Sequence, residues 1–143
     1  MKRHNGRILA VLSLYNMDIN QFNKEETLKT FNEILDMELS EEYPVEIDNK
    51  YAEKLINGVM DNLDKIDSII SNNLVKYTLD RLSYVDRAII RVATYELLEH
   101  NPKNIVINEA LEITKDYSSI DNDKQVNFNN SVLDKIATSI EKG

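Results

Sequence analysis

Residues 83–102 read SYVDRAIIRVATYELLEHNP, the strongest helical pattern in the chain. Ser83, with Asp86 three residues later, resembles the capping box that begins many helices, and Pro102 follows the end of the pattern. The apolar residues between them occur on nearly every side of the helix: Val85, Ile89, Ile90, Val92, Ala93, Leu97 and Leu98. A helix that is apolar on most sides is usually central, so this segment is predicted to lie in the middle of the fold.

The flanking segments repeat apolar residues with a period near 3.6, which indicates amphipathic helices rather than strands. Six further helices are expected: one carrying Ile8 to Ile19, one from Lys24 to the turn at Pro44, one from about Asp48, one carrying Leu63 to Ile70, one over 105–117 and one from about Asp123 to the C-terminus. We find no internal repeat and no convincing strand. The sequence therefore predicts one all-α domain of about seven helices, with one bundle at about 1–80 and another at about 81–143.

The composition argues against several classes of protein. The 143 residues include no cysteine and three glycines, so a disulfide scaffold, thiol catalysis and a glycine-rich phosphate loop are not expected. His4 and His100 are far apart in sequence, and neither has a neighbouring His or Cys, so no metal site is expected. No signal peptide or stretch of ~18 apolar residues is present. We expect a cytoplasmic protein that is no enzyme, needs no cofactor and does not enter a membrane.

The charges are distributed unevenly. The chain has 17 basic and 25 acidic residues, a net charge of −8, which argues against tight non-specific binding of nucleic acid. Residues 33–48 contain seven acids and no base, whereas Lys2, Arg3 and Arg7 lie in a start without acids. This distribution allows one basic end on an acidic body, although an ordinary solvated N-terminus explains it equally well.

Two features at the ends of the chain are candidates for RNA contact. Arg3 and Arg7 are one helical turn apart on the side away from the apolar stripe, where they are placed to contact successive phosphates. Phe128 lies off the apolar stripe of the last helix and is followed by Asn129 and Asn130, as base stacking beside amides requires. The alternative for Phe128 is packing in the seam between two halves. We expect the ring to be uncovered beside the cations.

Glu96 falls on the apolar side of the central segment. A carboxylate buried there costs several kcal/mol unless it finds hydrogen-bond donors. We expect a structural role in which Glu96 accepts from a helix N-terminus or from an arginine.

The run from Val85 to Tyr117 resembles the centre of the NusB family of bacterial transcription antitermination factors. Three further stretches agree in order: Arg7 through Leu14-Tyr15, then Tyr51-x-x-x-Leu55-x-x-Gly58-Val59, then Phe128-x-Asn130-x-Val132-Leu133-Asp134-Lys135. The match covers nearly the whole chain and is weakest between about residues 20 and 48. The resemblance implies two small helical bundles packed crosswise and a function that is not catalytic.

The resemblance also implies partners. Proteins of this family pair with the small-subunit ribosomal protein NusE, and the pair binds boxA leader RNA and helps the RNA polymerase elongation complex read through terminators, notably on rRNA operons. Matched positions assign RNA contact to Lys2, Arg3, Arg7, Phe128 and Asn130, and NusE contact to Tyr15, Ile19 and Asp86. Reversing the charge of Asp86 is then expected to weaken NusE binding by a few kcal/mol.

The chain departs from the family pattern at both RNA-binding stretches. The family start carries more arginines, so the isolated chain is expected to bind RNA weakly. Asn129-Asn130-Ser131 stands where Val-Asn-Gly is common, and the preceding loop is about three residues longer, which leaves a second register through Val126-Asn127 open. Two other functions remain open: a protein scaffold or homodimer of the same fold without an RNA role, and the RNA-binding fragment of an rRNA methyltransferase.

Overall fold

The computed structural model describes residues 1–118 and 122–143, and its regular structure there is entirely helical. The helices are α1 Lys2–Asn20, α2 Lys24–Leu39, α3 Asn49–Asp61, α4 Leu63–Asn72, α5 Tyr84–Leu98, α6 Lys103–Tyr117 and α7 Asn122–Lys142, with a 3₁₀ turn at Leu79–Arg81. The prediction of an all-α chain with seven helices is confirmed.

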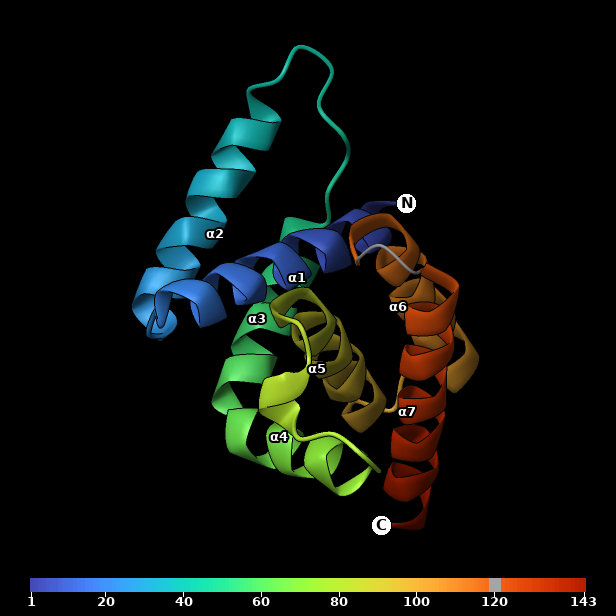
Figure 1. Ribbon diagram of the computed structural model, residues 1–143. Helices are drawn as coiled ribbons and strands as arrows, with labels where there is room; N and C mark the ends of the chain where they lie inside the picture. Colours follow the sequence, from blue (N-terminus) through green and yellow to red (C-terminus); the bar gives the residue numbers. More distant parts are fainter. Residues whose placement is uncertain (119–121) are drawn as a thin grey trace.

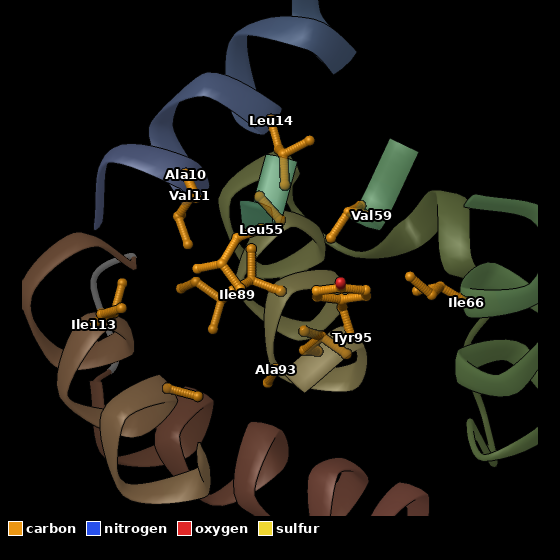
Figure 2. Packing of buried hydrophobic residues seen from close by; sticks show 14 of the residues in the cluster. Ala10, Val11, Leu14, Leu55, Val59, Ile66, Ile89, Ala93, Tyr95 and Ile113 are labelled. Atoms are coloured by element: carbon orange, nitrogen blue, oxygen red, sulfur yellow. The ribbon is translucent and has the colours of Figure 1, made fainter. Parts of the chain in front are cut away.

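Helix α5 is the centre of the molecule. Every residue from 88 to 97 is buried, as the all-round apolar pattern predicts. The helix packs against α1, α3 and α4 on one side and against α6 and α7 on the other (Figure 1). The buried side chains of all these helices form one cluster, in which Val11 of α1, Leu55 of α3 and Ile89 of α5 lie close together (Figure 2).

The predicted helix starts are made by side-chain caps. Ser83 Oγ accepts a hydrogen bond from the Asp86 backbone N–H at 3.2 Å, so α5 begins where its sequence indicates. Asn23 and Glu26 form a complete capping box at the start of α2. The first turns of these helices are therefore stabilised by local hydrogen bonds.

Gly58 marks a close contact between α3 and α5. A Cβ atom at this position would lie 2.1 Å from Cζ of the Tyr95 ring, so only glycine fits there. The far end of α2 and the chain that follows it extend beyond the body, whereas the start of α1 lies against α6 (Figure 1). The candidate site is built on that start and on α7.

Candidate nucleic-acid interface

Arg7 lies inside the protein, and the prediction that it is on an outer face is wrong. Its exposed fraction is 6%. The Nε and NH2 groups donate to both carboxylate oxygens of Glu96 at 2.9–3.1 Å, and NH1 lies 3.3 Å from Glu109. The prediction that the apolar stripe of α1 faces the core is also wrong, because Ile8 is only half-buried and Ile19 is exposed, whereas the side that carries Arg7 is buried. Helices α5 and α6 bring the two carboxylates to that side. Arg7 is therefore a structural residue, held away from any RNA.

Glu96 accepts from an arginine, as predicted. It also accepts from the Tyr51 hydroxyl at 2.5 Å, so the 2%-exposed carboxylate is supplied with donors from α1 and α3. Burial, and then the hydrogen bond to Glu96 and its negative charge, raise the pKa of Tyr51 well above its usual range. The cluster Arg7–Glu96–Tyr51 joins three helices in the core.

Tyr51→Phe tests this cluster. Loss of a hydrogen bond to a charged acceptor is expected to lower the free energy of unfolding by about 1.5–3 kcal/mol at neutral pH. The pKa of Tyr51 is raised in the folded state, so its contribution is complete below the unfolded value of about 10 and is lost as pH rises above it. Urea unfolding between neutral pH and pH ~11 should show a shallower alkaline decline for the variant. Parallel declines in the two proteins would contradict the assignment.

Lys2 and Arg3 reach solvent at the start of α1. Their side chains are 65% and 63% exposed, and each lies near one acid: Lys2 3.9 Å from Glu46 and Arg3 3.8 Å from Asp48. The Arg3 guanidinium also lies 4.4 Å above the centre of the Tyr51 ring. The cationic end of α1 therefore consists of these two residues.

Phe128 is half-buried, so its ring is neither uncovered as expected nor sealed in the core. Its centre lies 5.6 Å from that of Tyr77, with the two rings edge to face. Both rings line an open hollow of about 320 Å³. The hollow is also lined by Arg81, Leu82, Ser83, Asp86, Lys124 and Gln125. Two aromatic rings and two cations thus share one concave surface.

The two asparagines after Phe128 differ in exposure. Asn129 is fully buried and donates to Asp86 Oδ1 at 3.2 Å and to Thr114 Oγ1 at 3.0 Å. Asn130 is exposed on the surface of α7. The residue predicted to contact RNA, Asn130, is thus accessible, while its neighbour joins α7 to α5 and α6.

Asp86 is buried, with an exposed fraction of 3%, so the prediction of an open carboxylate that meets a partner is wrong. Ser83 Oγ donates to it at 2.6 Å and Ser118 Oγ at 2.8 Å, in addition to Asn129. These donors come from the α5 cap, the end of α6 and α7. Charge reversal at Asp86 would therefore disturb the fold rather than report on an interface.

Tyr15 and Ile19, the other residues predicted to meet a partner, lie one turn apart on α1. Tyr15 is half-buried and Ile19 is 44% exposed. Arg87 of α5 lies 3.9 Å from Asp18 and 5.1 Å from the centre of the Tyr84 ring. Tyr84 is 46% exposed. The sequence interpretation missed it, although this aromatic residue directly follows Ser83 of the predicted cap. Tyr15, Ile19 and Tyr84 therefore give α1 and the start of α5 accessible apolar side chains, with the charges of Asp18 and Arg87 beside them.

The two candidate RNA regions are not adjacent. Phe128 shares its hollow with Ser83, at the start of α5, whereas Arg3 shares a second hollow with Asn101, just beyond the end of α5. The 15 residues of α5 span about 22 Å at 1.5 Å per residue. The expectation of a single corner that combines the cations with the ring is therefore wrong, because periodicity within helices does not give their mutual placement.

His4 is brought to two acids of α6 that its sequence neighbours do not reveal. Its imidazole contacts Glu109 and lies 3.9 Å from a carboxylate oxygen of Glu112. The possible ligand atoms of His4, Glu109 and Glu112 all lie within 4.8 Å of one another, near enough to hold a cation. Among residues 1–118 and 122–143, this is the group of His and acidic residues with that spacing. Glu109 also pairs with Arg7 at 3.3 Å, so we interpret the group as a polar tie between α1 and α6.

Among the described residues, none of the helices combines the length and the apolar character that crossing a membrane requires.

Comparison with known proteins gives consistent matches over the chain. A family model described as the NusB family matches residues 4–138. The transcription antitermination protein NusB of Clostridium botulinum is 42% identical over 95% of this chain and 98% of its own length, and that of Bacillus subtilis is 35% identical over 99% of both. The solved structure of T. maritima NusB is 32% identical, with a TM-score of 0.78 over 96% of this chain and 92% of its own. NusB in a crystal structure of NusB and NusE with dsRNA is 28% identical, with a TM-score of 0.78 over 95% of this chain and 96% of its own.

Proposed function

Because this chain belongs to the NusB family, we propose that it acts as a transcription antitermination factor that binds RNA together with the protein NusE. The observation that carries the proposal is the match over 95% or more of the chain to relatives named as antitermination proteins. Similarity to NusB in a complex with NusE and dsRNA supports RNA and NusE as partners. We propose boxA leader RNA as the RNA, and read-through by RNA polymerase on rRNA operons in the cytoplasm as the process.

The hollow beside Phe128 suits an unpaired nucleotide. A base stacked on the Phe128 or Tyr77 ring would gain about 1–3 kcal/mol, whichever base it is. Arg81 and Lys124 line the same hollow and supply positive charge for the adjoining phosphates. Asn130, exposed on α7, is the residue that we propose to bond a base edge.

The surface for NusE is proposed on α1 and the start of α5, through Tyr15, Ile19 and Tyr84. Exposed aromatic and aliphatic side chains of this kind form the centres of protein interfaces. The net charge of −8 favours a basic partner, which a ribosomal protein would be, and speeds association with it. Since Arg7 is withdrawn from the surface, we expect the partner to supply much of the RNA affinity.

Phe128→Ala is expected to weaken RNA binding by the NusE complex by roughly 5- to 150-fold, the equivalent of 1–3 kcal/mol of stacking. The measurement is fluorescence anisotropy with a labelled boxA RNA, and co-purification with NusE should be unchanged. Tyr43→Ala is the matched control, because this tyrosine is 85% exposed on the loop after α2, away from the hollow. Equal loss in both variants would contradict the proposed stacking site. A complex with NusE that has no RNA affinity would instead favour the scaffold function.

A further inference from the structure

We propose that a second hollow, lined by Arg3, Lys50, Lys54 and Asn101, binds the phosphodiester backbone of single-stranded RNA. The proposal rests on the proposed RNA-binding function and adds to it a surface on α3 that the sequence analysis did not identify. The hollow measures about 420 Å³ and is formed where α1, α3 and the α5–α6 turn meet. Tyr51 forms part of its wall, and Asp48 is the acid among its lining residues.

The hollow gathers three cations, of which Arg3 is 47 residues before Lys50 and 51 before Lys54 in sequence. Lys50 and Lys54 are one turn apart on α3, so their side chains lie on the same face of that helix. Packing of α1 on α3 brings Arg3 next to them. A groove that carries several cations can contact successive phosphates of one strand, which a single isolated charge cannot do.

The acids around the hollow hold these cations only weakly. Arg3 Nε is 3.8 Å from Asp48, and Lys54 Nζ is 3.6 Å from Glu99, with both of the latter side chains more than 40% exposed. Exposed pairs of this kind contribute about 0–1 kcal/mol and are screened by salt. Lys50 makes no ion pair within the described residues. A phosphate group can therefore displace the acids at little cost.

Tyr51 positions the guanidinium group of Arg3. The Arg3 guanidinium lies 4.4 Å from the ring centre, and the ring is fixed because its hydroxyl bonds to the buried Glu96. A cation held over an aromatic ring loses less side-chain freedom on binding than one that moves freely. The buried cluster thus fixes the geometry of the surface site, although Arg7 itself does not reach it.

The hollow also adds positive charge to a chain whose α1 start carries few cations. With Arg7 buried, the start of α1 offers only Lys2 and Arg3 to RNA. Lys50 and Lys54 supply from α3 the positive charge that the α1 start lacks. The chain as a whole carries a net charge of −8, so the remaining surface does not supply a general positive charge in place of these lysines.

The test compares Lys50→Ala/Lys54→Ala with Lys29→Ala/Lys65→Ala in the full chain bound to NusE. The control pair removes the same charge from exposed positions on α2 and α4. Affinity for a labelled single-stranded boxA RNA is measured between about 50 and 200 mM salt. Loss of two phosphate contacts should reduce the slope of log K against log salt by about 1.4 and weaken binding on the order of tenfold at low salt. The control pair should change neither quantity by a comparable amount.

Three outcomes separate this proposal from the function on which it rests. Absence of RNA binding by the unmodified complex would overturn the proposed function itself. Normal RNA binding with an unchanged salt slope in the Lys50/Lys54 variant would overturn only the second site. Equal losses in the two double variants would also overturn it, because bulk charge would then explain the effect. Thermal unfolding at an unchanged temperature confirms that the variants fold.

Discussion

Arg7→Ala is expected to lower the free energy of unfolding by roughly 3–5 kcal/mol, because removing one partner of a buried pair leaves an uncompensated charge. Glu96 would lose the three guanidinium contacts at 2.9–3.1 Å and keep only the Tyr51 hydroxyl. The carboxylate is only 2% exposed in the native protein, so bulk solvent is a poor replacement for the lost donors. Urea unfolding at neutral pH measures the loss.

The matched control is Arg3→Ala, one turn earlier on the same helix. Its side chain is 63% exposed, so the loss of its weak surface pair should change stability by no more than about 1 kcal/mol. Equal, small effects of the two substitutions would show that Arg7 is not buried against Glu96. A variant that replaces Arg7, Glu96 and Tyr51 by Met, Leu and Phe should recover much of the stability, because uncharged packing can substitute for a buried pair.

This expectation changes which arginine can test RNA binding. A loss of RNA binding in Arg7→Ala would follow from unfolding and would carry no information about contact. Arg3, which keeps its solvent exposure, is the residue whose substitution reports on the cationic end of α1.

The sequence predicted those features that depend on one helix alone. Apolar residues all around 83–102 place α5 at the centre, and the Ser83 and Asn23 caps are where local chemistry puts them. Glu96 could be predicted to accept from a helix N-terminus or an arginine, because a carboxylate among apolar residues needs donors, and the donor is Arg7. Each of these inferences needs only the geometry of a single helix and the cost of burying a charge.

Features that depend on two or more helices could not be predicted in this way. The stripe through Ile8 and Ile19 predicts which side of α1 faces the core, but it is the opposite side, where Arg7 lies, that is buried against the other helices. Asp86 could be assigned to a partner contact because its hydrogen-bond partners Ser118 and Asn129 are 32 and 43 residues away in sequence, so the sequence does not show that they lie against it. The separation of Arg3 from Phe128 follows from the direction of α5, which periodicity does not specify.

Arg91→Ala is expected to lower the free energy of unfolding by about 3 kcal/mol or more, for a related reason. Arg91 is 5% exposed and forms a bidentate pair with Asp67 of α4 at 2.8–2.9 Å, while NH1 donates to Asp18 of α1 at 2.9–3.0 Å. The substitution removes the cation that Asp67 and Asp18 share, and it leaves Asp18 with Arg87 at 3.9 Å. Urea unfolding measures the loss, and Arg81→Ala, on an exposed turn, is the control.

The same substitution also affects the surface proposed for NusE. Asp18 lies next to Ile19 on α1, so loss of Arg91 should loosen the surface proposed for NusE and weaken co-purification with that partner. Arg91→Lys should restore only part of the stability, because an ammonium group cannot make the bidentate contact to Asp67 and still reach Asp18. Full recovery by lysine would show that charge alone is needed there. If Arg91→Ala left the chain as stable as Arg81→Ala does, the proposed tie between α1, α4 and α5 would be wrong.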